Sequence, residues 1–411
     1  MKSLLLVAIS FTIVTSSALA ATVIVEKVPG GKAELGHVEL HGLKAGEFTP
    51  EPWQNNTLHL LSDARRPLIA PRQAGQFRNI YAPSAVQTDR GWRVFYGAWD
   101  GVPTGNDRIY SLETKDFVDF SGRETVIEHG VFIHCCNVNA HKGLDGAYTM
   151  VCTVYPDKDG LNKPAIFTSP DGVKWNGVTA PYPAAFEDIV KMSGYDAYPQ
   201  ADINGVNVLF PAPDGLYLYF NNYKDFGKVY RAKQHDGLNF QFEKTVLETG
   251  HAINDLKSFT TAGKTWYLMG LHMNTSGLWY SLSQDPAAFT DEHPLLTSQD
   301  DAEKYIVAVG WVTEGNRVLG ALYGAGSFEG LNRNRIFARW LQKRVVFVST
   351  DGQRFEPSQA VGPDRQVMPF PTGAKLRGKF ELYGEDGQTL IGVSEELDLS
   401  PDSIYQFSVK D

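Results

Sequence analysis

A short motif that returns five times along the chain constrains the fold more than any other feature of the sequence. Each copy joins an aromatic-rich strand to a polar turn that contains an aspartate, and an aromatic residue follows the turn in most copies. Aspartate suits such a turn because its carboxylate accepts hydrogen bonds from nearby backbone N–H groups. The copies span residues 109–117, 166–175, 218–226, 278–286 and 346–355.

The spacing of these turns predicts a β-propeller. The turn aspartates are residues 116, 171, 225, 285 and 351, so the repeat is 54 to 66 residues long, which leaves room for four strands. In the first repeat, strands are expected over 80–86, 92–98, 108–112 and 124–128. We therefore predict an all-β, five-bladed β-propeller with an N-terminal extension and a short C-terminal β segment. A β-sandwich with similar turns is the alternative.

The composition agrees with this fold and excludes some classes of binding partner. Glycine (39), phenylalanine (23), tyrosine (18) and tryptophan (8) are plentiful, as in large β proteins. The 38 basic and 47 acidic residues give a net charge of -9. An acidic chain without a basic stripe argues against a nucleic-acid partner or an anionic membrane surface.

The first twenty residues are typical of a secretory signal peptide. Met1-Lys2 is a short positive start, Leu4 to Val14 is largely apolar, and Ala18-Leu19-Ala20 matches a cleavage site. A retained membrane anchor is the alternative, but the apolar run is too short for it. We expect an exported protein, periplasmic or extracellular, without a membrane span. The expected divisions are 1–20 signal peptide, 21–65 N-terminal extension, 66–365 propeller and 366–411 C-terminal strands.

The chain has only three cysteines, Cys135, Cys136 and Cys152. Expected strands over 134–139 and 148–154 place Cys152 near Cys136, so a cross-strand disulfide is one interpretation and three buried thiols are the other. The spacing matches no zinc-binding pattern.

In a propeller, the innermost strands begin on the face where the loops between second and third strands also emerge, and ligands bind in the funnel on that face. Carboxylates expected there are candidates for an acid and base pair, although a turn cap or surface charge is the alternative for each: Asp196, Asp255, Asp100 and Glu329. Candidate substrate-binding residues are Arg78, Asn79, Tyr81, Trp99, His134, Asn137, His251, Lys257, His272, Trp311 and Arg333. Such polar and aromatic side chains suit the hydroxyls and apolar faces of a sugar.

Two segments resemble the blades of five-bladed glycosidases, the superfamily of arabinanases, β-xylosidases, invertases and anhydro-galactosidases. Tyr81-Ala82-Pro83-Ser84-Ala85-Val86 followed by Gly91-Trp92-Arg93-Val94-Phe95-Tyr96 is similar to one of their hairpins, and the turns at Ser169 and Ser349 are similar to theirs. The resemblance covers roughly residues 75–357 and implies an Asp base or nucleophile, a second Asp and a Glu acid. This chain has Ser84 where those proteins have Asp, and it lacks their Glu-Gly-Pro strand.

Three functions are compatible with these observations. The first is a secreted glycoside hydrolase with an Asp/Glu or Asp/His pair, and the second is a carbohydrate-binding propeller without catalysis, favoured by the missing family carboxylates. The third is another reaction on the same scaffold, such as a calcium-dependent nucleotidase or a lyase. No cofactor is expected to be required; Ca²⁺ at the acidic segment 157–160 is the exception considered, although that segment lacks the other ligands of a standard loop.

Overall fold

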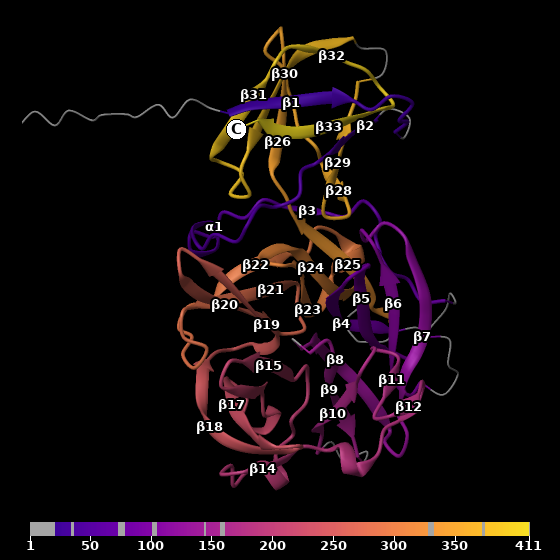
Figure 1. Ribbon diagram of the computed structural model, residues 1–411, viewed down its shortest axis with the longest axis vertical. Coiled ribbons are helices and arrows are strands. Elements are labelled where there is room, and N and C mark those ends of the chain that lie inside the picture. The colour runs from indigo at the N-terminus through magenta and orange to yellow at the C-terminus, as the bar shows by residue number, and fades with distance from the viewer. Residues whose placement is uncertain are drawn as a thin grey trace, which may run out of the picture.

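The computed structural model describes residues 21–33, 37–72, 79–100, 105–143, 145–156, 161–327, 333–371 and 375–410. These residues form a five-bladed β-propeller and a β module built from both ends of the chain (Figure 1). The prediction of an all-β fold with five blades is confirmed.

The first four blades follow one another along the chain, each starting with its innermost strand. Blade 1 contains β4 (Ile80–Thr88), β5 (Gly91–Ala98), β6 (Arg108–Thr114) and β7 (Phe120–Glu128), with β13 (Tyr182–Pro183) added at its outer edge. Blade 2 contains β8 (His134–Lys142), β9 (Tyr148–Tyr155) and β10 (Lys163–Ser169), followed by the small hairpin of β11 (Lys174–Trp175) and β12 (Val178–Thr179). Blade 3 contains β15 (Val208–Ala212), β16 (Gly215–Phe220), β17 (Lys228–Asp236) and β18 (Asn239–Glu248), with β14 (Lys191–Ser193) outside. Blade 4 contains β19 (Ala252–Thr261), β20 (Lys264–His272), β21 (Gly277–Ser283) and β22 (His293–Thr297).

Blade 5 joins the two ends of the ring. Its inner three strands are β23 (Tyr305–Glu314), β24 (Arg317–Gly326) and β25 (Arg335–Leu341), whereas its outermost strand is β3 (Leu60–Ser62), which precedes blade 1. β3 pairs antiparallel with β25, Leu60 opposite Leu341 and Ser62 opposite Arg339. The ring is therefore closed by backbone hydrogen bonds between segments far apart in the sequence.

Five apolar clusters fill the spaces between neighbouring blades. Successive residues of a strand point to opposite faces of the sheet, so Phe95 packs between blades 1 and 2 while Tyr96 packs between blades 1 and 5. In the same way Leu218 packs toward blade 2 and Tyr219 toward blade 4. Tyr280 lies in the cluster between blades 4 and 5. Each blade is thus buried on both faces, which explains its nearly continuous apolar strands.

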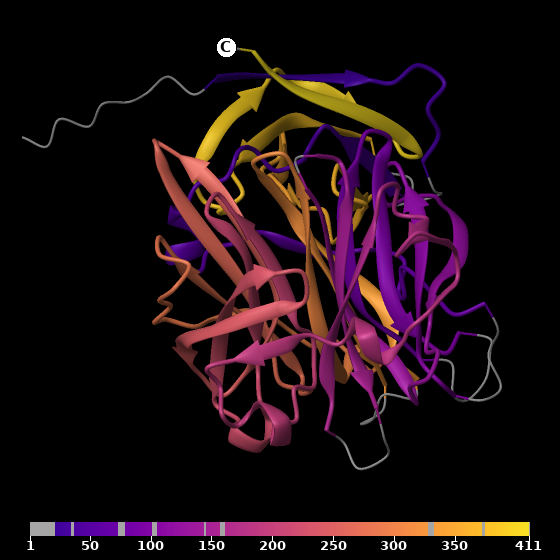
Figure 2. The same ribbon diagram turned by 60° about the horizontal axis from the view of Figure 1, so that its bottom comes forward.

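The second unit, here called the terminal module, is a sheet of ten strands with its own apolar core. The N-terminal side contributes β1 (Ala21–Lys27) and β2 (His37–His41), and the C-terminal side contributes β26 (Arg344–Ser349), β27 (Arg354–Phe355), β28 (Gln359–Val361), β29 (Arg365–Pro369), β30 (Leu376–Tyr383), β31 (Leu390–Ser394), β32 (Leu397–Leu399) and β33 (Ser403–Lys410). Val38, Phe347, Phe380 and Phe407 belong to its core. Figure 2 shows β1 and β33 lying together at the side of the module away from the propeller.

Strand pairing divides the chain differently from the expected boundaries. The outermost propeller strand lies within the expected N-terminal extension, and the terminal module begins at Arg344 rather than at 366. Two motif copies also do not lie in the third strand of a blade, where the first repeat predicted them. The third copy begins in the second strand of blade 3, and the fifth belongs to the terminal module. Both errors have one cause, because a strand ending in an aspartate turn is a local structure that occurs at many positions in a β protein.

A bulge near the start of the inner strands changes which way their side chains point. The register shifts between Tyr81 and Ser84 in β4 and between Cys136 and Asn139 in β8, where Asn137 has φ 54°. Before the bulge in β8, Cys135 pairs with Val154 and Cys136 with Thr153, so Cys152 lies on the face of Cys135, between blades 1 and 2, whereas Cys136 lies on the opposite face, with Tyr81. All three are buried free thiols, so the interpretation as thiols holds and the proposed neighbour of Cys152 was wrong.

Asp63 connects the propeller to the terminal module. Its side chain is fully buried, and its Oδ2 accepts hydrogen bonds from Trp340 Nε1 (2.7 Å) and from the Gly362 backbone N–H (3.0 Å). Arg65 forms an ion pair with it at 2.8 Å and donates to the backbone carbonyls of Phe117 and Val118 in blade 1. One carboxylate therefore joins blade 5, the module and, through Arg65, blade 1.

We expect Asp63→Ala to lower the free energy of unfolding by about 3 to 5 kcal/mol, because it leaves buried donors without an acceptor and Arg65 without its counter-ion. Denaturant unfolding of the purified protein measures this, with the exposed Asp119→Ala as the control, expected within about 0.5 kcal/mol of wild type. Equal stability of the two variants would show that Asp63 does not hold the units together.

Candidate functional site

The inner strands begin on one side of the propeller, here called the funnel face, and polar side chains of blades 1 to 3 meet there. Tyr81 lies near the start of β4, and His134 and Cys136 near the start of β8. Tyr155 ends β9. The other members precede strands: Asp107 comes directly before β6, and Asp202 and Asn204 lie shortly before β15. These seven residues are the funnel cluster.

Asp107 and His134 form a close pair at the centre of the funnel cluster. His134 Nδ1 lies 3.0 Å from Asp107 Oδ2, and the backbone N–H of Cys135 donates to the Asp107 carbonyl at 3.1 Å. Asp107 is buried, whereas the His134 side chain is 27% exposed. The imidazole can therefore reach a ligand, and the carboxylate behind it fixes its orientation.

Burial controls the electrostatics of Asp107. Removal from water raises the pKa of its carboxyl above the usual value, while His134, the Tyr81 hydroxyl and Arg108 oppose the shift. Its Oδ1 has no hydrogen-bond partner among the described residues, although it is fully buried. Such an atom carries a desolvation cost, so this side of the carboxyl is suited to a donor supplied by water or a ligand.

Tyr155 contacts this pair and lies near a second carboxylate. Its ring packs edge-on against His134 with centroids 5.2 Å apart, and its hydroxyl donates to Asn204 Oδ1 at 2.7 Å. Asp107 and Asp202 are both close enough to contribute to the raised pKa of the Tyr155 hydroxyl, which arises mainly from burial. Asp202 is half-buried and accepts from Asn162 Nδ2 at 2.6 Å.

An exposed aromatic ring lies beside Asp202. Tyr223, in the loop between β16 and β17, donates its backbone N–H to the Asp202 carbonyl at 2.8 Å, and its side chain is part-exposed. A methyl group added at Gly205 would lie 3.0 Å from the Tyr223 hydroxyl, so this glycine leaves room for the ring. An accessible phenol next to a carboxylate can stack on the apolar face of a sugar.

The structure brings some of the residues nominated from sequence to this cluster. Tyr81 and His134 belong to it, and Asn137 Nδ2 lies 3.5 Å from Asn204 Oδ1. Asn79 and Trp99 are buried near the funnel face, with no partner for Asn79 Nδ2, Asn79 Oδ1 or Trp99 Nε1 among the described residues. Arg333 is exposed at the start of β25. Arg78 and Glu329 lie outside the described residues.

Asp255 and Lys257 lie along the axis of the propeller rather than in the funnel cluster. The Asp255 carboxylate is 1% exposed; its Oδ1 accepts from Asn139 Nδ2 and Lys257 Nζ at 3.0 Å each, and its Oδ2 accepts from the backbone N–H of Trp311 at 2.9 Å. It thus connects the inner strands of blades 2, 4 and 5. Trp311 itself is buried against Trp53 of the short helix α1 (Glu51–Gln54) and is a core residue.

The remaining nominated residues have structural surroundings. Asp196 is exposed just after β14, at the outer edge of blade 3 and away from the inner strands. Asp100 is buried and accepts from the Arg72 N–H (2.6 Å) and Arg123 Nη1 (3.2 Å). His251 stacks on Trp279 and pairs with Glu292 at 2.6 Å.

His272 ends β20 opposite Ala252, and burial lowers its pKa to about 4. It is therefore neutral at neutral pH.

Sequence reasoning missed Asp107, Tyr155, Asp202 and Asn204. Asp107 was within reach, because it lies in the same β5–β6 loop as the nominated Trp99. Asp202 and Asn204 were missed because Asp196 was expected at the start of an inner strand, whereas the inner strand of blade 3, β15, begins at Val208.

Among the residues that the structure describes, no group of three or more His, Cys, Asp or Glu side chains is placed to hold a metal ion. The acidic segment 157–160 considered for Ca²⁺ lies outside them. No helix in the described part of the chain is long and apolar enough to cross a membrane.

Comparison with known proteins relates the chain to others through its fold. No protein-family model matches, and no curated protein is similar in sequence. A Bacteroides thetaiotaomicron protein proposed to be a glycosidase superimposes with a TM-score of 0.50 at 16% identity, over 71% of this chain and 99% of that one. The catalytic domain of the GH62 α-L-arabinofuranosidase of Coprinopsis cinerea gives 0.49 at 15% identity, over 69% and 97%. The first likeness shows that the propeller fold expected from the resemblance is shared.

We expect Asp255→Asn to destabilise the protein by about 3 kcal/mol, because the amide presents a donor to groups that are already donors and removes the partner of Lys257. Asp196→Asn is the matched control and is expected to change stability by less than about 0.5 kcal/mol. Thermal and denaturant unfolding measure both. An Asp255→Asn variant with wild-type stability would contradict the structural role and return Asp255 to the catalytic candidates.

Proposed function

We propose that the protein hydrolyses a glycosidic bond of an oligo- or polysaccharide at the funnel cluster. The observation that carries this proposal is the part-exposed His134 held by the buried Asp107, with a second carboxylate, Asp202, close enough to affect the same Tyr155 hydroxyl as Asp107. Glycoside hydrolysis needs one group that gives a proton to the leaving oxygen and a carboxylate near the anomeric carbon. The fold shared with a proposed glycosidase supports the same choice.

The residues divide the chemistry between them. The His134 imidazolium donates its proton to the glycosidic oxygen as the bond to the anomeric carbon breaks, and the Asp107 carboxylate stabilises the charged imidazole beforehand. Asp202 is the carboxylate available to act either as a general base that takes a proton from the attacking water or as the nucleophile that attacks the anomeric carbon. The Tyr223 ring stacks on the sugar, and the side chains of Asn204 and Tyr155 are placed to bond its hydroxyls.

Export is part of this proposal and rests on the signal-peptide pattern of the first twenty residues. An exported hydrolase meets its polysaccharide outside the cytoplasm, and the acidic chain, with a net charge of -9, suits a soluble partner better than a membrane surface.

The alternative is a propeller that binds carbohydrate without cutting it. It is favoured by one observation, that the carboxylates Asp100 and Asp255 nominated for catalysis are buried in structural contacts. Incubation of the protein from residue 21 with a panel of polysaccharides, with products read by mass, separates the two. A released sugar supports hydrolysis, and binding without product favours the alternative.

On the substrate found in this way, we expect His134→Gln and Asp202→Asn each to lower kcat/KM by about 100-fold or more, the usual range for losing a proton-transfer group. Asp196→Asn is the control and should keep wild-type activity. Folding is checked by circular dichroism and unfolding. Wild-type turnover in His134→Gln would overturn the assignment of the acid.

The pH profile tests the role of Asp107. Its pKa is raised by burial, so as pH falls the carboxyl takes up a proton at a pH higher than an ordinary aspartate would and stops stabilising the His134 imidazolium. We expect kcat/KM to fall on the acid side with this raised pKa, and Asp107→Asn to show low activity without that acid limb. An unchanged acid limb in Asp107→Asn would assign it to another group.

A further inference from the structure

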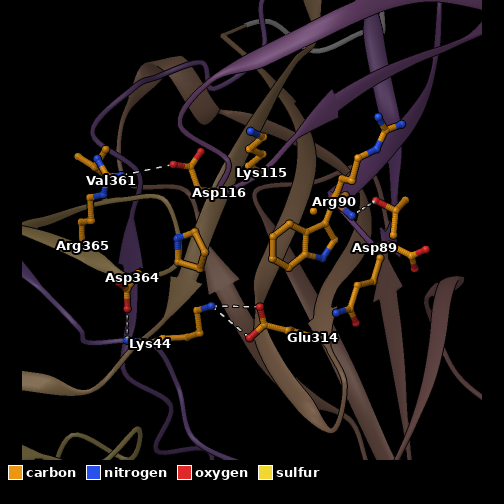
Figure 3. A pocket seen from close by; sticks show the side chains of 14 residues that line it. Lys44, Asp89, Arg90, Lys115, Asp116, Glu314, Val361, Asp364 and Arg365 are labelled. Atoms are coloured by element: carbon orange, nitrogen blue, oxygen red, sulfur yellow. Dashed lines mark hydrogen bonds and ion pairs between the residues drawn. The ribbon is translucent and has the colours of Figure 1, made fainter. Parts of the chain in front are cut away.

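A large cavity lies on the side of the propeller opposite the funnel, between the turns of blades 1 and 5 and the terminal module (Figure 3). Its volume is about 660 Å³. The propeller side is made by the β4–β5 turn, the β6–β7 turn and Glu314 at the end of β23, and the module side by Lys44 and the turn before β29. None of these residues belongs to the funnel cluster.

Most acidic side chains lining this cavity are already paired. Glu314 bonds Lys44 Nζ at 3.1 Å, and Asp116 bonds Arg365 at 3.3 Å. The Asp364 carboxylate accepts the backbone N–H groups of Gly42 and Lys44. Figure 3 shows the contacts of Glu314, Asp116 and Asp364 with Lys44 and Arg365.

Two basic side chains of the lining remain without an ion pair among the described residues. These are Arg90 in the β4–β5 turn and Lys115 in the β6–β7 turn, and both are exposed. Gly91 brings the two turns together: with φ 126°, its position for a Cβ atom lies 2.7 Å from Lys115 Cα. Only glycine allows this approach, so the backbone itself holds the two cations on adjoining turns.

A second hollow of about 360 Å³ continues the cavity across blade 1. It shares Thr88, Arg90, Trp92, Lys115 and Asp116 with the first, so the two cations lie where the hollows meet. Gln87 and Thr88 add neutral hydrogen-bonding groups to the lining. Three acidic residues line the second hollow. Glu113 and Asp116 form ion pairs, whereas the Asp119 carboxylate has no partner among the described residues.

We propose that this groove binds a chain of acidic sugars, with a uronate carboxylate held between Arg90 and Lys115. An extended hollow with neutral polar groups and two unpaired cations matches the hydroxyls and carboxylates of such a chain, whereas a single small anion would fill only the point between the cations. The site is separate from the funnel and needs no hydrolysis there, so it anchors a polymer rather than cutting it.

Isothermal titration with tetragalacturonate tests the proposal, with neutral maltotetraose and inorganic phosphate as comparison ligands. The titration uses the His134→Gln protein, so that heat from turnover of the ligand does not add to the heat of binding. A failure to bind in this groove would not contradict the hydrolysis proposed in the funnel. We expect tetragalacturonate to bind at least tenfold more tightly than either comparison ligand, and its affinity to fall with added salt.

In Arg90→Ala/Lys115→Ala we expect affinity for tetragalacturonate to fall at least tenfold. The charge-matched control is Lys264→Ala/Lys379→Ala, which changes one blade 4 turn and one module strand outside the groove. Asp119→Asn should strengthen binding, because it removes a nearby negative charge. Equal affinity of both double variants, no binding, or phosphate binding as tightly as tetragalacturonate would each overturn the proposal.

Discussion

The hydrogen bonds between β3 and β25 close the ring, and the position of every other part of the molecule depends on that closure. β3 must reach the outer edge of the last blade from the N-terminal side, where β25 ends at Leu341. Both chain segments therefore leave the propeller at the same place, β2 before β3 and β26 after β25. As a direct consequence, the terminal module contains strands from both ends of the chain. Asp63, next to β3, lies where the module and the propeller meet.

The number of blades could be predicted from the sequence because it depends on strand length and spacing, which are local properties. The motif that suggested it was a weaker guide to position. Ser349 and Asp351 in the terminal module make the same side-chain hydrogen bond as Ser169 and Asp171 in blade 2, since the turn chemistry is identical in both places. Blade 5 lacks the motif because β25 leads directly into the module instead of turning back into a fourth strand.

The candidate site was predictable where it depends on the inner strands and not where it depends on loops. Tyr81 and His134 follow from the rule that inner strands begin in the funnel. Asp196 was misjudged because residues 174–193 form short strands that decorate the outside of blades 1 and 3, which delays the start of blade 3. Asp255 was expected in the funnel and lies near the start of an inner strand, β19, next to a bulge. Donors of β8 and β23 surround it there, on the axis of the propeller.

Structural polar groups and candidate functional groups in this fold differ in whether their polar atoms already have partners within the protein. Asp63 and Asp255 are buried with their oxygens bonded to protein donors, so a ligand has nothing to offer them. Asp107 is equally buried but keeps one oxygen without a partner among the described residues, beside an imidazole that solvent can reach. On the opposite face Arg90 and Lys115 have no ion pair within the part of the chain that the structure describes. Since the fold gains little from groups in these states, they are the groups on which we base the two proposed sites.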